Sequence, residues 1–336
     1  MAIIAAQPIG QSEDFMAILD RVSDLAVIEK PILIVGESGT GKELIASRLH
    51  FLSPRWEQIF VSINCAAYTE AELDVELFGS SLIDGRDDTN GRFFQAHNGT
   101  LLLDNIGAVS PRLQEKLMRA IEYGSYESRG AIQSQDVNVR VLAATHIDLP
   151  AAVERGTFRA DLLYRLAFDV LTLPPLRARI DDILPLSEHF GKKIAADLGA
   201  AQFPGLSAEA AERLLTYPWP GNVRELRSVI ERSTARAWLH DESLSDSIRE
   251  LTFDPFEGPH RLTEETVSAA PSAPTQPSVD DTNQTVPFSE RVMTFERRLI
   301  DEALKLEDHH QGRAAEHLGL SYHQFRGLLR KHGLKK

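Results

Sequence analysis

One short loop constrains the fold of this chain more than any other feature of its sequence. It follows the apolar residues 32–35, precedes a helical pattern, and consists of Gly36, Glu37, Ser38, Gly39, Thr40, Gly41, Lys42 and Glu43. Its glycines let successive backbone N–H groups turn toward phosphate oxygens at the positive end of the next helix, and the lysine adds charge to the β- and γ-phosphates. The strand–loop–helix context therefore predicts a binding site for ATP or ADP. One departure is Glu43, which stands where such loops usually carry a hydroxyl residue.

A second apolar run ends in a carboxylate. Nucleotide-binding sites with such a phosphate loop usually contain a second strand that ends in an acidic residue. Three leucines at 101–103 precede Asp104, and a carboxylate at this point typically holds Mg²⁺. A strand that simply ends in aspartate is the alternative, but the upstream loop requires a partner of this kind. In hydrolases of this class the next residue is usually a glutamate that activates water, whereas here it is Asn105. An amide cannot accept that proton, so the sequence predicts weak ATP hydrolysis.

Alternation of short β-rich runs with helical patterns predicts a parallel, doubly wound α/β sheet. We expect strands over residues 31–35, 60–63, 100–103, 137–144 and 168–173, and helices over residues 42–51, 70–78, 111–122 and 158–166. Residues 181–248 read as helical throughout and predict a smaller α-domain. The expected division is a nucleotide-binding α/β part at 1–174, a helical lid at 175–253, a linker at 254–287 and a C-terminal all-α domain at 288–336.

The linker and the tail differ from the body in composition. Residues 254–287 are rich in Pro, Ser and Thr and poor in large apolar residues, so they cannot bury enough surface to offset their ordering entropy. The whole chain carries a net charge of −13. From Gln311 to Lys336, however, six Lys or Arg stand against a single acid, Glu316. A basic module on an acidic body indicates contact with nucleic acid, although a solvated helix end is the simpler alternative.

Two short helices in the tail form a candidate helix-turn-helix. They cover residues 312–317 and 321–332, preceded by a longer helix on which Val292, Phe295, Leu299 and Ala303 share a face, as a dimer or core stripe would. Ser321 is a suitable N-cap for the last helix. With its apolar residues turned inward, that helix would present to double-stranded DNA a set of polar residues, namely Ser321, Tyr322, His323, Gln324, Arg326 and Arg330.

Cysteine content and hydropathy bear on the compartment. Cys65 is the single cysteine, so neither a disulfide framework nor a cysteine zinc site can form. Apolar runs are only a handful of residues long, too short to span a membrane, and the first residues lack the basic start of a secretory signal. These features predict a cytoplasmic protein.

Several motifs, taken in order, resemble those of the bacterial sigma-54-dependent enhancer-binding activators. The resemblance runs from about Gln11 to the C-terminus and is interrupted by the linker and one loop. Besides the phosphate loop, it is carried by Asn64-Cys65-Ala66-Ala67, Glu76-Leu77-Phe78-Gly79, Phe158-Arg159-Ala160-Asp161-Leu162, Leu173-Pro174-Pro175-Leu176-Arg177 and Trp219-Pro220-Gly221-Asn222-Val223-Arg224-Glu225-Leu226. It implies an AAA+ fold, a ring hexamer, ATP-driven remodelling of promoter complexes of RNA polymerase with sigma-54, and a Fis-type helix-turn-helix.

The resemblance also implies roles for individual residues. Arg159 and Arg165 match the arginines that reach the γ-phosphate of a neighbouring subunit, where they stabilise charge on the transferred group. Arg224 matches the lid arginine that senses nucleotide, and Asn64 matches the asparagine that pairs with the catalytic glutamate. Thr145-His146 occupies a sensor position at which the family usually has Thr-Asn.

Two departures from the family pattern bear on its output. Asn105 replaces the catalytic glutamate, and residues 80–91 replace the Gly-Ala-Phe-Thr-Gly-Ala loop that contacts sigma-54. Loss of a general base lowers a rate by roughly 10²–10⁴-fold, although an amide can still orient water, as glutamine does in some GTPases. Both departures affect ATP-driven remodelling of the sigma-54 promoter complex. We therefore expect a DNA-binding regulator that binds nucleotide and hydrolyses ATP poorly.

Two other interpretations remain open at this stage. In one, the chain is a working sigma-54 activator ATPase whose base and loop have unrecognised substitutes. In the other, it is a non-enzymatic subunit that joins the ring of a related activator, which Arg159 and Arg165 favour because they act only across an interface. Since no receiver domain precedes residue 11, control is expected from a partner protein in trans or from the expression level.

Overall fold

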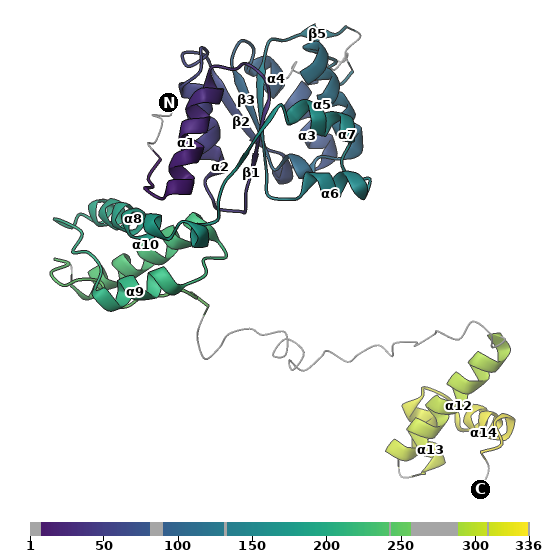
Figure 1. Cartoon of the computed structure of the whole chain (residues 1–336). Coiled ribbons are helices and arrows are strands. Elements are labelled where there is room, and N and C mark those ends of the chain that lie inside the picture. The colour runs from purple at the N-terminus through teal and green to yellow at the C-terminus, as the bar shows by residue number, and fades with distance from the viewer. Residues whose placement is uncertain are drawn as a thin grey trace. The chain divides into compact units, whose positions relative to one another are not determined.

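The computed structural model describes residues 8–80, 90–130, 133–241, 243–256, 288–307 and 309–334. Its chain divides into two compact units, residues 1–256 and 257–336, which are treated separately (Figure 1). Among the described residues, none of the helices is both long enough and apolar enough to cross a membrane.

A parallel sheet forms the centre of the first unit. Within the described residues it has five strands in the order β2-β3-β6-β1-β7. Their bounds are Ile32–Val35 for β1, Phe60–Asn64 for β2, Thr100–Asp104 for β3, Arg140–Thr145 for β6 and Asp169–Thr172 for β7. All the pairings are parallel, so the carboxyl ends of the strands meet at one edge, where Asn64 lies opposite Asp104 and Val35 opposite Thr145. The predicted α/β fold class is confirmed.

Helices cover both faces of this sheet (Figure 1). Leu102 packs toward the side of α1 and α2, while Leu101 and Leu103 pack toward the other side. The three consecutive leucines of β3 thus point to alternate faces of the sheet and are buried on both, as is usual for strands of a parallel sheet. The covering helices are α1 (Glu13–Ala26), α2 (Lys42–Phe51), α3 (Glu70–Phe78), α4 (Arg92–Gln95), α5 (Pro111–Tyr123), α6 (Leu149–Glu154) and α7 (Ala160–Leu166).

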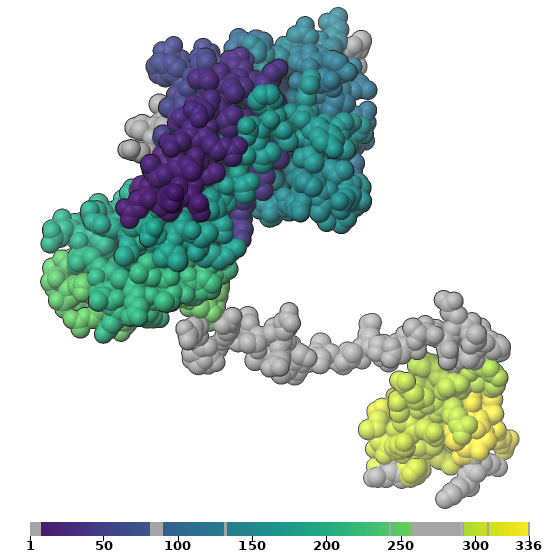
Figure 2. Space-filling model, in the orientation of Figure 1, coloured from purple at the N-terminus to yellow at the C-terminus, as the bar shows by residue number. Residues whose placement is uncertain are grey.

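Helix α1 was not among the predicted helices. Its buried residues, Phe15, Leu19, Val22 and Leu25, recur at helical spacing, and its outer side is exposed on the surface of the first unit (Figure 2). The signal was thus present in the sequence. The structure also adds a small hairpin of β4 (Ser125–Tyr126) with β5 (Gln135–Asp136), and 3₁₀ helices η1 (Cys65–Ala67), η2 (Ile106–Ala108), η3 (Leu176–Ala178) and η4 (Ile180–Asp182).

A helical lid follows the sheet and is tied back to it by a buried carboxylate. The lid consists of α8 (Ile183–Asp197), α9 (Ala208–Thr216) and α10 (Asn222–His240), packed around the buried Trp219. Asp182 is fully buried and accepts hydrogen bonds from the backbone N–H groups of Gln11 and Ser12, at 2.6 and 2.8 Å. Because one carboxylate holds the segment before α1 against the start of α8, the lid and the sheet have a defined junction.

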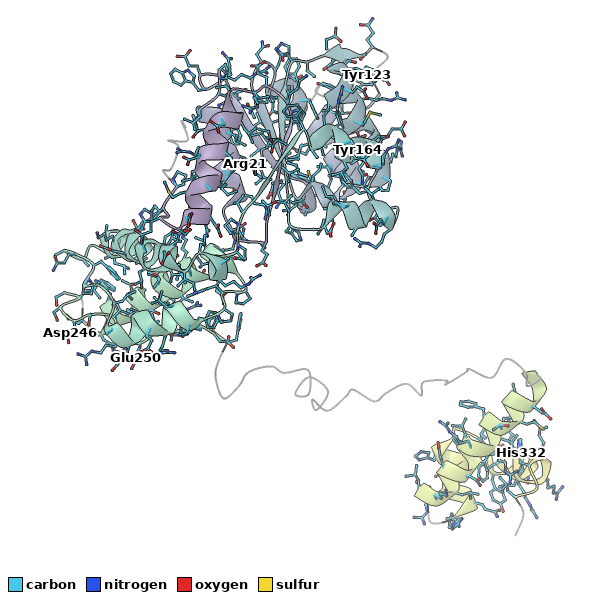
Figure 3. The ribbon with its side chains drawn as sticks, viewed as in Figure 1. Arg21, Tyr123, Tyr164, Asp246, Glu250 and His332 are labelled. Carbon is cyan, nitrogen blue, oxygen red and sulfur yellow. The ribbon has the colours of Figure 1, made fainter. Side chains whose placement is uncertain are left out.

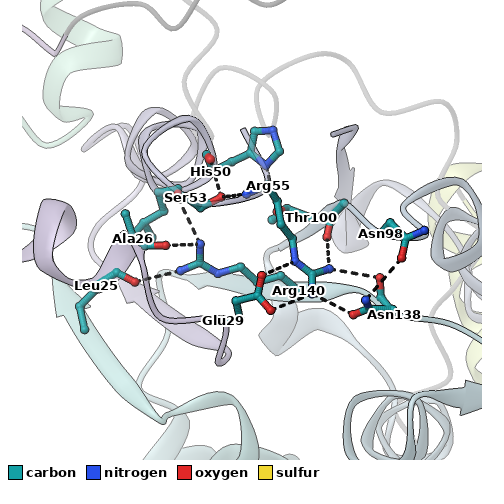
Figure 4. A network of polar contacts seen from close by, with 12 residues as sticks. Leu25, Ala26, Glu29, His50, Ser53, Arg55, Asn98, Thr100, Asn138 and Arg140 are labelled. Carbon is teal, nitrogen blue, oxygen red and sulfur yellow. Dashed lines mark hydrogen bonds and ion pairs between the residues drawn. The ribbon is translucent and has the colours of Figure 1, made fainter. Parts of the chain in front are cut away.

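Arg140 is a buried cation that joins three secondary-structure elements (Figure 4). It lies on β6, is 1% exposed, and donates to the carbonyl oxygens of Leu25, Ala26 and Leu49 at 2.9–3.2 Å. Burial lowers the pKa of Arg140 to about 10, so the guanidinium stays charged at neutral pH. The positive charge compensates carbonyl groups near the ends of α1 and α2, where the helix dipoles are negative.

Replacing Arg140 by methionine should destabilise the first unit by about 3–5 kcal/mol, because three carbonyls lose a buried, charged donor. Urea unfolding followed by circular dichroism measures this. The matched control is Arg21→Met, which breaks the exposed ion pair between Arg21 and Asp169 and should cost no more than about 1 kcal/mol. Equal losses in the two variants would mean that Arg140 does not support the fold.

The second unit is a small three-helix domain with its own core. Its helices are α12 (Phe288–Leu306), α13 (Gln311–His317) and α14 (Tyr322–Lys331). Ile300, Ala303, Phe325 and Leu329 are buried together. The predicted stripe on α12 is therefore divided: Ala303 belongs to the core, whereas Val292 and Phe295 are 37% and 45% exposed.

Candidate nucleotide-binding site

The phosphate loop folds around its own lysine. Lys42 begins α2, and its Nζ donates to the carbonyl oxygens of Gly36 and Glu37 at 2.8 and 2.9 Å. Burial lowers the pKa of Lys42, an effect that the nearby Asp104 carboxylate opposes. Gly39 and Gly41 adopt φ of 80° and 102°, and a Cβ on Gly39 would lie 2.3 Å from the carbonyl oxygen of Gly221. The loop thus requires glycine both for its backbone conformation and for the close approach of the lid.

Lid residues contact two of the predicted loop residues directly. Arg177 forms a double hydrogen bond with Glu37, at 2.8 and 2.5 Å, and this holds the pKa of Glu37 at about 2. Asn222 donates to Glu37 Oε2 at 3.1 Å, and Arg224 donates to Ser38 Oγ at 2.9 Å. The predicted residue Arg224 therefore lies at the loop. Arg177 and Asn222 were part of recognised motifs but had been given no role, because a motif does not show which side chains its residues meet.

Four polar side chains gather where β3, β2 and β6 end. Asn105 Nδ2 donates to Asn64 Oδ1 at 3.0 Å and to Asp104 Oδ2 at 3.3 Å. His146 Nδ1 lies 3.1 Å from Asn105 Oδ1. The structure thus brings together Asn64, Asp104 and Asn105, as predicted, and adds His146 from the sensor position.

Asp104 suits magnesium held jointly with phosphates. Among the described residues there is no cluster of three or more His, Cys, Asp or Glu that could hold a metal ion by itself. Mg²⁺ usually takes one or two carboxylates and completes its shell with water and substrate phosphates. A single aspartate at a strand end beside the phosphate loop fits that arrangement.

The two arginines predicted to act on a neighbouring subunit lie on another part of the surface, at and near α7. Arg159 pairs with Asp161 at 2.7 Å, and Arg165 lies 3.6 Å from a carboxylate oxygen of Glu122. Their side chains remain 40% and 45% exposed. Figure 3 shows Tyr164, also on α7, at the surface of the first unit, and its side chain is 80% exposed. This corner is open to solvent, as an interface contact would require.

Helix α14 presents the predicted DNA-contact residues on its exposed side. Phe325 and Leu329 are buried, whereas Tyr322 is 46% exposed. The remaining exposed positions of the predicted set are Ser321, His323, Gln324, Arg326 and Arg330. Ser321 and Gln324 form a capping box, so the Gln324 side chain also serves the start of the helix. His332, labelled in Figure 3, and Lys331 both contact Glu296, which joins α14 to α12.

Comparison with protein families assigns each part of the chain. Residues 8–172 match the sigma-54 interaction domain, residues 177–252 match the AAA+ ATPase lid domain, and residues 292–332 match the bacterial regulatory protein, Fis family. The Psp operon transcriptional activator of Escherichia coli strain K12 is 47% identical over 327 residues, which cover 96% of this chain and 97% of that protein. The chain belongs to the sigma-54-dependent transcriptional activators. The resemblance, the AAA+ fold and the Fis-type helix-turn-helix are thereby confirmed.

A further relative and a solved structure are similar over most of this chain. The Nif-specific regulatory protein of Azotobacter vinelandii is 38% identical over 320 residues, covering 94% of this chain and 57% of that protein. The crystal structure of NtrX from Brucella abortus in complex with ADP superposes with a TM-score of 0.68 at 28% identity, covering 98% of this chain and 70% of that chain. NtrX has also been solved in complex with ATP.

Proposed function

We propose that this member of the sigma-54 activators binds Mg-ATP and DNA, hydrolyses ATP slowly, and does not open sigma-54 promoters without the family's sigma-54-contact loop. One observation carries the proposal. The complete phosphate loop, with Lys42 and Asp104, stands beside a strand end where an amide, Asn105, replaces the acid that would activate water. Nucleotide binding also draws support from the ATP and ADP complexes of NtrX.

Each predicted site residue has a role in this proposal. Backbone N–H groups of residues 36–43 and the Lys42 ammonium would bind the phosphates, and Asp104 would hold Mg²⁺. Arg224 would exchange its hydrogen bond with Ser38 for the nucleotide. Asn64 would orient Asn105, as its 3.0 Å hydrogen bond already does. When bound, Mg²⁺ supplies charge that offsets the negative phosphates.

We propose that the protein assembles through its own kind or with a related activator. Arg159 and Arg165 are exposed, and each pairs with an acid that a phosphate group of another subunit could replace. A ring hexamer or a dimer would bring these arginines to a neighbouring nucleotide. The same exposure favours a second function, in which this chain enters the ring of a related activator and reduces its ATP turnover.

We propose that α14 reads double-stranded DNA, with Tyr322, Arg326 and Arg330 as contacts to bases and phosphates. The separate basic module supports this, because Arg and Lys contacts to phosphates supply much of the affinity for DNA. Paired binding would need half-sites about one helical turn apart, or a multiple of that. The site of action would be the cytoplasm.

Lys42→Ala should weaken ATP and ADP binding by about 100-fold or more, because the ammonium that would bind the phosphates is lost. Isothermal calorimetry with the full chain measures this. The matched control is Lys30→Ala, at an exposed lysine just before β1, which should bind as the unmodified protein does. The absence of ATP and ADP binding by the unmodified chain would refute the proposed function.

A further inference from the structure

His146 and Asn105 both depart from the family pattern, and the structure places them in contact at 3.1 Å. We propose that His146 is the general base of ATP hydrolysis in this protein, and that Asn105 is the residue that positions it. This inference rests on the proposed function, because it requires ATP on the phosphate loop. It identifies a proton acceptor at a site that has lost its carboxylate.

A chain of hydrogen bonds determines which ring nitrogen of His146 carries hydrogen. The backbone N–H of Ala66 donates to Asn64 Oδ1 at 3.0 Å, so that atom is the amide oxygen. Asn105 Nδ2 donates to the same oxygen at 3.0 Å and to Asp104 Oδ2 at 3.3 Å, which sets the orientation of the Asn105 amide. Its remaining atom, Oδ1, can only accept. His146 Nδ1 must therefore donate, and it carries the hydrogen.

In its neutral form, the imidazole therefore carries its hydrogen on Nδ1 and keeps a lone pair on Nε2. A ring protonated on Nδ1 accepts protons at Nε2, and the partner of Nδ1 selects this tautomer. Asn105 is held in position by its backbone, with φ 55° and ψ 44°, a left-handed conformation that asparagine tolerates well. The backbone N–H of Ala108 donates to the Asn105 carbonyl at 2.9 Å, which stabilises this turn. The amide is thus a preorganised support.

His146 lies beside the phosphate loop and is open to solvent. It directly follows β6, and the carbonyl of the preceding residue, Thr145, accepts from the backbone N–H of Gly36 at 3.2 Å. His146 is exposed and lines, with Gly36 and Glu37, a cavity of about 660 Å³. Solvent water therefore has access to this side chain.

The carboxylates near this cavity already have hydrogen-bond partners. Glu37 is bound by Arg177, and the carboxylate of Asp148 accepts from the backbone N–H of Ala151 at the start of α6. Asp104 is the proposed magnesium ligand. Among the described residues, His146 Nε2 has no hydrogen-bond partner, and it belongs to the side chain that contacts Asn105 directly.

The proposed step is a balanced hydrolysis. The oxygen of water attacks the γ-phosphorus, and a proton of that water passes to His146 Nε2. The bond from the γ-phosphorus to the β–γ bridging oxygen breaks, and its electron pair leaves with ADP. Asn105 Oδ1 continues to accept from Nδ1–H of the imidazolium, which releases its proton to solvent after phosphate departs.

Single-turnover hydrolysis by the full chain tests the proposal. His146→Ala should lower the rate by about 10²-fold or more, with ATP affinity in calorimetry unchanged, and added imidazole should restore part of it. The control His189→Ala changes an exposed histidine of α8 and should alter neither quantity. A His146→Ala rate equal to that of the unmodified chain would overturn the proposal, as would an unmodified chain that binds ATP without hydrolysing it. Failure to bind ATP would instead refute the proposed function.

A second measurement needs no nucleotide. Nitrogen-15 spectra of histidine-labelled, nucleotide-free full chain should show His146 protonated at Nδ1 in its neutral form, with the resonance assigned by its loss in His146→Ala. Asn105→Ala should give mixed tautomers, because the amide oxygen that selects Nδ1–H is gone. A His146 protonated at Nε2 in the unmodified chain would overturn the role of Asn105.

Discussion

Restoring the acid with Asn105→Glu is expected to raise steady-state ATP turnover by about two orders of magnitude. Asn105 lies between His146 and Asp104, so a carboxylate at this position would stand next to the proposed magnesium ligand, closer than His146 does. A well-placed general base contributes roughly 10²–10⁴ in rate. The left-handed backbone at residue 105 opposes the gain at a cost of about 1 kcal/mol for a longer side chain.

The matched control is Asn98→Glu. Asn98 is an exposed asparagine with φ 62°, so this variant makes the same chemical change in the same backbone conformation away from the site. Its turnover should equal that of the unmodified chain. If Asn105→Glu shows no increase over this control, base catalysis is not what limits hydrolysis. In Asn105→Glu the new carboxylate would accept the proton from water. Adding His146→Ala to this variant should therefore lower ATP turnover only slightly.

Promoter opening should not follow turnover in Asn105→Glu. The loop that contacts sigma-54 in the family corresponds to residues 80–91, which lack the Phe-Thr pair; of these, residues 81–89 lie outside the described part of the structure. Permanganate footprinting on a sigma-54 promoter would detect opening. We expect none from Asn105→Glu, and opening only when the family loop is also introduced. ATP-dependent opening by the unmodified protein would contradict both this prediction and the proposed slow hydrolysis.

Removing the tail is expected to abolish specific DNA binding. A chain ending at Pro287 keeps the first unit, whose cores contain no residue beyond Phe253, and loses α12, α13 and α14. Binding to the cognate duplex should fall by at least 10³-fold, the lower end of the usual ratio of specific to non-specific affinity. Equal affinity of the truncated and full chains, measured by fluorescence anisotropy, would show that α14 is not the reading helix.

Point variants on α14 sharpen this test. Arg326→Ala and Arg330→Ala should each weaken binding by about 1–3 kcal/mol. If the replaced arginine contacts a phosphate, the slope of log affinity against log salt concentration should also fall by about one. Arg298→Ala on α12 is the matched control, because Arg298 is 58% exposed and pairs with Glu302 on the same helix. Equal losses at Arg298 and Arg326 would indicate a diffuse electrostatic effect.

Local patterns in the sequence were sufficient for the elements and for much of the candidate site. The apolar run before the phosphate loop predicted β1, because a strand buried on both faces needs apolar side chains at every position. On α14, helical spacing predicted that Phe325 and Leu329 would be buried and Arg326 and Arg330 exposed. Such features depend on neighbouring residues, whose spacing the sequence states directly.

Contacts between distant segments were decided by the tertiary structure alone. Asn105 and His146 are 41 residues apart and meet because β3 and β6 are neighbours in the sheet. Arg140 was predicted to lie on a strand, but its role in joining α1 and α2 depends on how those helices end above β6. By itself, the sequence determined the strands, the phosphate loop and the lost acid. The position of His146 next to Asn105 depends on the order of the strands in the sheet. Periodicity within a segment carries no information about that order.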